Sequence, residues 1–257
     1  TVSDGTGTDI TFSGSDTTLS ANWAAFTETV SGLQKYEYAI GTTSGGTDVV
    51  TWTSNSTDTT VTKTGLTLTS GSTYYISVRG TDNVGNVSTI ITSNGVMVDT
   101  ASPVAGTIID GTETDIDWTN STSTLAATWS GFSDTLSGIQ TYEYAIGTTS
   151  GGTEIVDWTD SSADTEVLTL TNGTTYYVSV RATDNVGNVS ATATTDGITV
   201  DTDVPVISSV VEGSLTTDVD YQNIDSTLII YWIGIDSASG ISVYEYALGT
   251  TSGGDET

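Results

Sequence analysis

The chain of 257 residues contains no cysteine, no histidine and only 2 prolines. Without cysteine no disulfide can form, and without cysteine or histidine the usual ligands of zinc and copper are missing. Catalysis by a Ser-His-Asp or Cys-His arrangement is excluded because both require histidine. No apolar run approaches the roughly 20 residues that a membrane-spanning helix needs, so we expect no membrane insertion of this segment.

Positive charge is also scarce. The sequence has 4 basic and 32 acidic residues, which gives a formal net charge of −28. We expect no nucleic acid as a partner, because almost nothing is present to neutralise phosphates. An anionic membrane surface is disfavoured for the same reason. Such an acidic surface keeps a chain soluble by self-repulsion and attracts divalent cations.

The residues that are abundant favour β-structure. Hydrophobic residues make up 35% of the chain, which is enough to bury a core. Short segments alternate between apolar and polar positions, so that Leu19, Ala21 and Trp23 share one face of an expected strand, and Tyr36 and Tyr38 share one face of the next. Gly, Asn, Asp and Ser clusters separate these segments, which predicts an all-β fold.

Long blocks of sequence recur along the chain. Residues 36–46 recur at 142–152 and again at 244–254, where a leucine replaces one isoleucine. Residues 81–88 recur without change at 183–190, and both prolines lie in two similar linkers. The repeats predict three domains, which we call unit 1 (1–99), unit 2 (103–201) and unit 3 (205–257).

Unit 3 contains only the N-terminal half of the repeat, because it has no counterpart of residues 176–201. We therefore expect the chain to be an excerpt from a longer array. The alternative is that a strand from another chain completes this unit.

The order of motifs resembles the fibronectin type III module. A strand ending in Trp is followed by Tyr-x-Tyr, then by Leu-x-x-x-x-x-Tyr, and then by Val-Arg-x-x-Asp-x-x-Gly-Asn-x-Ser, and both complete units keep this order. The resemblance implies tandem β-sandwiches of seven strands, each with a tyrosine corner formed by Leu68 and Tyr74 or by Leu170 and Tyr176. It extends to the tandem modules of large bacterial cell-surface proteins, including the gliding adhesins of Bacteroidetes-type bacteria.

The core expected from these patterns is aromatic and aliphatic. It consists of Trp23, Tyr36, Tyr38, Leu68 and Tyr74 in unit 1, Trp129, Tyr142, Tyr144, Leu170 and Tyr176 in unit 2, and Trp232 in unit 3.

Carboxylates gather where the resemblance places the ends of the units. The repeated Thr-Asp-Asn-Val-Gly-Asn loop would face the incoming linker, which brings Asp99, Asp134 and Asp184 to one junction. Asp201 and Asp236 would lie at the next junction. Calcium takes several carboxylate and carbonyl oxygens, so we expect calcium at these junctions. The alternative is turn chemistry alone, since Asp and Asn hydrogen-bond their own backbone in turns.

Outward-facing side chains offer further candidates. We expect cross-strand ion pairs between Glu37 and Arg79 and between Glu143 and Arg181, each contributing about 0.2–1 kcal/mol. Trp52 and its repeat Trp158 would either cover the edge of the core or stack on sugar rings. Some carboxylates among so many will lie at glycosidase spacing by chance, and a small sandwich offers no obvious cleft, so we expect no catalytic residues.

These observations favour a mechanical role. Near-identical repeats add length without new chemistry, and their loop tips do not diverge as those of ligand-reading modules would. We therefore expect a non-catalytic stalk or adhesion scaffold on the bacterial cell surface. We expect no cofactor other than calcium at the junctions. The expected partners are the neighbouring repeats of the same long chain and surface glycans or proteins. The alternative is an accessory spacer or carbohydrate-binding module of a secreted polysaccharide-degrading enzyme.

Overall fold

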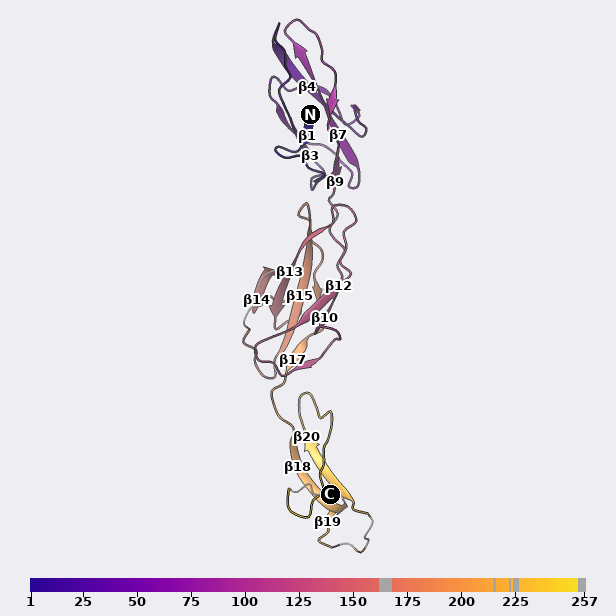
Figure 1. Ribbon diagram of the computed structural model, residues 1–257, viewed down its shortest axis with the longest axis vertical. Coiled ribbons are helices and arrows are strands. Elements are labelled where there is room, and N and C mark those ends of the chain that lie inside the picture. The colour runs from indigo at the N-terminus through magenta and orange to yellow at the C-terminus, as the bar shows by residue number, and fades with distance from the viewer. Residues whose placement is uncertain (162–167, 215, 222, 224–226, 254–257) are drawn as a thin grey trace.

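The computed structural model describes residues 1–161, 168–214, 216–221, 223 and 227–253. Within these residues the regular elements are all β-strands, and there is no helix of the length and apolarity needed to cross a membrane. Figure 1 shows the three units lying end to end along the long axis, with the N-terminus in the first and the C-terminus in the last. Every sheet in the described residues is confined to one unit.

Unit 1 is a sandwich of two sheets. One sheet has the order β1-β3-β6 and the other has the order β2-β9-β7-β4-β5, with β8 beside β7. The strands are β1 (Val2–Asp4), β2 (Phe12–Ser13), β3 (Thr18–Trp23), β4 (Leu33–Gly41), β5 (Val50–Ser54), β6 (Thr60–Thr64), β7 (Thr73–Asp82), β8 (Ile91–Thr92) and β9 (Val96–Val98).

Unit 1 has more strands than the seven expected because its first and last strands are each divided. The first part of the opening strand, β1, pairs antiparallel with β3, whereas the second part, β2, pairs parallel with β9 in the other sheet. Gly95 separates β8 from β9 with a φ of 98°, and a Cβ on it would lie 2.7 Å from the Tyr75 ring. The chain therefore needs glycine at this position.

Unit 2 repeats this architecture. Its sheets have the orders β10-β12 and β11-β17-β15-β13-β14, with β16 beside β15. The residues that correspond in sequence to β6 lie in 162–167, outside the described residues. The strands are β10 (Thr107–Asp110), β11 (Trp118–Thr119), β12 (Ala127–Ser130), β13 (Ile139–Gly147), β14 (Val156–Asp160), β15 (Thr175–Asp184), β16 (Ala193–Thr194) and β17 (Ile198–Val200).

Unit 3 forms one small sheet, in which β18 (Val206–Ser214) pairs with β19 (Thr217–Asp218) and β20 (Ile230–Ile235). The third copy of the Tyr-Glu-Tyr motif, at Tyr244, is described but forms no strand. In unit 1 this motif lies on β4, whose longest pairing is with β7. Residues 205–257 contain no counterpart of β7, so the described residues of unit 3 have no equivalent of the long β4–β7 pairing.

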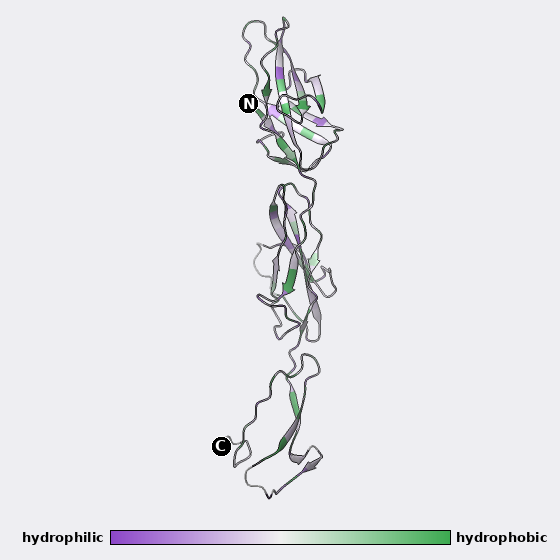
Figure 2. Ribbon diagram, turned by 90° about the vertical axis from the view of Figure 1, so that its right-hand side faces the viewer, coloured by the Kyte–Doolittle hydropathy of each residue, from purple (hydrophilic) through white to green (hydrophobic). Residues whose placement is uncertain are grey.

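The core of unit 1 lies between its two sheets. Leu19 and Trp23 on β3 face Tyr36 and Ile40 on β4, and all four side chains are buried. The Trp23 and Tyr36 rings meet edge to face with centroids 5.7 Å apart, a favoured aromatic geometry. Figure 2 shows hydrophobic residues along the strands of each unit, including β18 and β20.

The expected core is less complete in the later units. Trp129, Tyr142 and Tyr144 are only half-buried, and in the described residues β12 pairs with β10 alone whereas β3 lies between two strands. Trp232 was expected to be buried but is 37% exposed. That prediction is wrong for this chain, because no second sheet covers β20 in the part of unit 3 that the structure describes. The remaining expected core residues, Tyr38, Leu68, Tyr74, Leu170 and Tyr176, are buried.

Both complete units contain the tyrosine corner. Tyr74 Oη accepts a hydrogen bond from Thr69 N at 2.9 Å, and Tyr176 Oη accepts one from Thr171 N at 3.0 Å. These bonds tie the start of the long strand β7 or β15 to the turn before it. The arrangement matches what the resemblance to fibronectin type III implies.

Candidate functional site

The loop after β7 is closed by its own aspartate. Asp82 Oδ1 accepts hydrogen bonds from Val84 N at 3.0 Å and Asn86 N at 2.8 Å, and Asp82 Oδ2 accepts one from Asn86 Nδ2 at 2.8 Å. Donation by the Asn86 side chain, partly offset by burial, lowers the pKa of Asp82 to about 2. Gly85 adopts a φ of 95°, which completes the turn. Turn chemistry is therefore present in this loop.

The same loop in unit 2 faces the linker from unit 1. Asp184 accepts hydrogen bonds from Val186 N, Asn188 N and Asn188 Nδ2 at 2.7–2.9 Å. Asp184 is fully buried. Burial alone would raise its pKa, but the hydrogen bonds led by those from Asn188 outweigh burial and hold the pKa below its usual range. The loop thus presents an ionised carboxylate at the junction.

Asp99, the last residue of unit 1, is bonded to both units. Its backbone N donates to Ser13 O at 2.8 Å within unit 1. Its Oδ2 accepts a hydrogen bond from Ser137 N at 3.0 Å, and its carbonyl accepts one from Asn188 Nδ2 at 3.2 Å, both from unit 2. Its Oδ1 accepts from Ala101 N at 3.0 Å, and the side chain is fully buried. Rotation of unit 2 against unit 1 would have to break these bonds.

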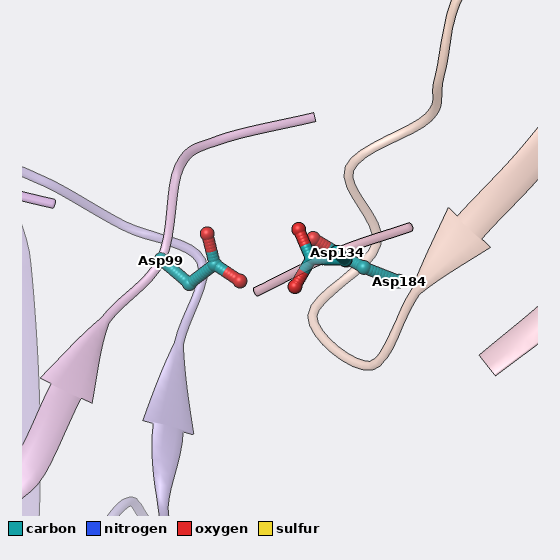
Figure 3. A group of neighbouring side chains, drawn as sticks. All are labelled: Asp99, Asp134 and Asp184. Atoms are coloured by element: carbon teal, nitrogen blue, oxygen red, sulfur yellow. The ribbon is translucent and has the colours of Figure 1, made fainter. Parts of the chain in front are cut away.

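Three carboxylates meet at this junction. Asp134 comes from the loop after β12, and its Oδ1 accepts hydrogen bonds from Leu136 N at 3.0 Å and Gly138 N at 2.8 Å. One oxygen from each of Asp99, Asp134 and Asp184 lies within 4.8 Å of the others. Figure 3 shows the Asp99 carboxylate, carried by the linker, facing the other two. Calcium–oxygen bonds of about 2.3–2.6 Å allow this spacing, and a carboxylate that accepts N–H bonds still has lone pairs for a cation.

The second junction repeats part of this arrangement. Asp201 Oδ2 accepts a hydrogen bond from Ser239 N at 3.0 Å, and Asp236 Oδ1 accepts from Ala238 N at 3.1 Å and Gly240 N at 2.9 Å. Hydrogen bonds from the side chain and then the backbone of Ser239 hold the pKa of Asp201 below its usual range. The counterpart of Asp184 would follow the missing long strand, so only two of the three carboxylates are present.

The expected ion pairs lie on the outer face of the larger sheets. Arg79 Nε lies 3.0 Å from Glu37 Oε2, and Arg181 Nε lies 2.9 Å from Glu143 Oε2. Lys35 Nζ also lies 3.0 Å from Glu37 Oε1, a contact that the sequence reasoning missed.

Each of these arginines also covers a tryptophan ring. The Arg79 guanidinium carbon lies 4.3 Å from the centroid of Trp52, and that of Arg181 lies 4.2 Å from the centroid of Trp158. The rings therefore stack against arginines on the outer face of the sheet. One face of each ring is occupied by an arginine, which leaves less surface for a sugar.

Sequence reasoning also missed two fully buried aspartates, Asp4 and Asp110, at the ends of β1 and β10. Burial, partly offset by a hydrogen bond from Ser93, raises the pKa of Asp4 to about 6. Burial raises the pKa of Asp110 to about 6. Both are followed by glycine, and Asp-Gly is typical of exposed turns, so nothing in the local sequence indicates that they are buried.

Comparison with known proteins gives one curated relative and several similar structures. No family model matches the chain. Exoglucanase B of Cellulomonas fimi is 30% identical over 246 residues, which cover 88% of this chain but only 20% of that protein. The chain thus spans about a fifth of the length of this relative.

Similar solved structures include modules of three proteins. The fibronectin(III)-like modules of Clostridium thermocellum CbhA are 16% identical with a TM-score of 0.36, over 78% of this chain and 94% of that one. The FN1–FN3 domains of chicken CNTN1 are 14% identical with a TM-score of 0.38, over 77% and 65%. Domains A168–A170 of titin are 16% identical with a TM-score of 0.42, over 74% and 61%.

TM-scores of this size do not establish how modules are arranged, so the fold class rests on the chain's own sheets. The sheet orders of unit 1 and the two tyrosine corners define an all-β array of fibronectin type III-like sandwich units.

Proposed function

We propose that the chain is a non-catalytic spacer of a secreted, extracellular protein. The observation that carries this proposal is Asp99, which is fully buried at a junction and is hydrogen-bonded to unit 1 and unit 2 at once. A linker held in this way transmits orientation from one unit to the next. End-to-end units with short, bonded linkers suit a part whose task is to set a distance.

Small-angle scattering of the chain in solution tests the spacer role. We expect an elongated particle. A matched variant has six Gly/Ser residues inserted between Ser102 and Pro103. It should give a broader distance distribution, because the longer, flexible linker no longer holds Asp99 in place against unit 2. Identical scattering from both proteins would contradict a junction that fixes orientation.

Two settings for such a spacer are supported by different observations. The similarity to an exoglucanase favours an accessory spacer, or a set of carbohydrate-binding modules, in a secreted polysaccharide-degrading enzyme. The near-identical repeats and loop tips favour the stalk of a bacterial cell-surface adhesin. The mass and location of the native polypeptide distinguish them. Several hundred kilodaltons retained at the cell surface would indicate a stalk, and a smaller product released into the medium would indicate an enzyme.

We further propose that calcium binds at the first junction between Asp99, Asp134 and Asp184. The proposal is supported by three carboxylates from two units with oxygens within 4.8 Å and by the burial of two of them. Calcium should raise the melting temperature and narrow the distance distribution relative to chelator. Asp134→Asn should reduce both effects. If the wild-type chain has the same melting temperature and distance distribution in calcium and in chelator, calcium does not bind at this junction.

A further inference from the structure

Unit 2 carries a second group of carboxylates, away from the junction residues. Asp110 ends β10, Asp115 lies in the loop that follows it, and Asp196 lies between β16 and β17. One oxygen from each lies within 4.8 Å of the others. These residues come from two distant parts of the sequence, and hydrogen bonds within the loops hold them together.

The backbone fixes the arrangement of this group. Asp110 N donates to Asp115 Oδ1 at 2.9 Å, and Ile116 N donates to Asp110 O at 3.0 Å. Gly197 N donates to Asp110 Oδ2 at 3.1 Å. The two loops are therefore bonded to the same buried aspartate, and the carboxylates of Asp115 and Asp196 lie beside it at the exposed rim.

One carboxylate oxygen of Asp110 is buried without a hydrogen-bond partner. Asp110 is fully buried, and its Oδ1 accepts no hydrogen bond. Burying an anionic oxygen without a donor is costly, and buried carboxylates are normally hydrogen-bonded, paired or bound to a metal. This oxygen is an unsatisfied acceptor in a cluster that already holds three negative charges.

The chain has no cation of its own to neutralise the cluster. Its 4 basic residues are Lys35, Lys63, Arg79 and Arg181, and only the last belongs to unit 2. Arg181 is paired with Glu143 at 2.9 Å on the outer face of the larger sheet. Neutralisation of the cluster by a side chain of unit 2 is thus excluded.

Unit 1 contains the same cluster, including a buried Oδ1 of Asp4 without a partner, with one change. Asp4 and Asp9 correspond to Asp110 and Asp115, and Asp4 N donates to Asp9 Oδ1 at 2.8 Å. The place of Asp196 is taken by Asn94, whose Nδ2 donates to Asp9 Oδ2 at 2.9 Å. An amide supplies in unit 1 a donor that an ionised carboxylate cannot supply in unit 2. The change from Asn to Asp therefore exchanges an internal hydrogen bond for a third negative charge.

We propose that Asp110, Asp115 and Asp196 bind a calcium-class divalent cation in unit 2, and that the matching cluster of unit 1 binds it much more weakly. Only oxygen ligands are present, which hard cations prefer, and affinity for calcium rises with the number of charged ligands. The bound ion would satisfy the buried Oδ1 and would join the loop after β10 to the loop before β17. Its role would be to fasten the opening strand of the unit to its closing strand.

Calorimetric titration of the metal-free 257-residue chain with calcium chloride at constant ionic strength tests the site. Asp196→Asn should weaken one binding event by about tenfold or more, because a charge is removed from the ligand set. Asn94→Asp should add a binding event of similar affinity in unit 1. Both variants place a residue where the other unit already has it, so both should fold. Asp134→Asn removes a carboxylate from the junction group only and should leave this event within about twofold.

Hydrogen exchange locates the bound ion. Calcium should slow amide exchange in residues 111–117 and 195–197, and Asp196→Asn should abolish that slowing. Three results would overturn the site: equal titrations of the wild-type chain and Asp196→Asn, unchanged exchange in both loops, or equal displacement by magnesium at the same concentration. The last would mean that divalent cations only screen the acidic surface. Loss of binding in Asp134→Asn alone would support the junction ion and exclude this one.

Discussion

Asp99 Oδ2 accepts a hydrogen bond from Ser137 N at 3.0 Å, so the last residue of unit 1 is bonded to a loop of unit 2. Asp201 and Ser239 repeat the relationship at 3.0 Å across the second junction. The same hydrogen bond at both junctions indicates that the linker is part of the repeat and helps to orient the next unit. This aspartate, rather than the proline that follows, makes the direct bond between units.

Replacing Asp99 with alanine should loosen the first junction. The backbone N–H groups of Ser137 and Ala101 lose their acceptor, which costs about 1–3 kcal/mol where these groups stay buried. We expect small-angle scattering to show a broader distance distribution, while circular dichroism stays that of a folded β-protein. Asp203→Ala is the matched control, because it removes an exposed linker carboxylate. Equal effects of the two substitutions would mean that charge, rather than hydrogen bonding, sets the junction.

Removing the hydroxyl of the tyrosine corner should destabilise one unit at a time. In Tyr74→Phe the Thr69 N–H loses its acceptor, which should lower the free energy of unfolding of unit 1 by about 1–2 kcal/mol. Tyr75→Phe on the opposite face of the strand is the control and should change it by less than about 0.5 kcal/mol. Urea unfolding followed by tryptophan fluorescence measures both. A control as damaging as Tyr74→Phe would contradict a specific role for the corner.

The tryptophans of β3 and β12 should differ in their contribution to stability. Trp23 is 5% exposed, and Trp23→Ala should cost about 3–5 kcal/mol through lost burial and the cavity left behind. Trp129 is half-buried and packs against Tyr142 with centroids 6.1 Å apart. Trp129→Ala should cost less, about 2–3 kcal/mol. Chemical unfolding of the two variants gives the comparison, and a larger loss for Trp129→Ala would show that unit 2 is packed more tightly than the exposures indicate.

Repetition and alternation made the fold predictable. The spacing of Leu68 and Tyr74 predicts the corner, and the alternation around Glu37 places it on the face where Arg79 lies. The split of the opening strand was not predictable, because β2 pairs with β9, which follows it by more than eighty residues. The residues around β2 do not indicate which of the two sheets it joins.

The acidic sites were predictable only in part. The junction carboxylates lie in repeated loops and linkers, so Asp99 and Asp184 could be placed together once the ends of the units were known. Asp110 could not, because an Asp-Gly pair predicts an exposed turn and burial depends on a loop far along the chain. The difference between Asn94 and Asp196 could be interpreted only from the structure, which places each of them beside a buried aspartate.

Asp4 should make unit 1 more stable as the pH falls from neutral. Its pKa is raised to about 6 from 3.8, so the folded state binds a proton before the unfolded chain does. Stability from this group is fully present below about pH 4 and is lost as the pH rises through 6. Asp4→Asn removes the titration while keeping an oxygen for the Gly95 N–H. In chelator at pH 7.5 we expect the variant to exceed the wild-type chain by about 1–3 kcal/mol, and the difference should shrink toward pH 4. Urea unfolding of both proteins at each pH measures the difference, in which the other carboxylates cancel. A difference that stays constant or grows as the pH falls would mean that Asp4 is ionised at no cost in the folded unit.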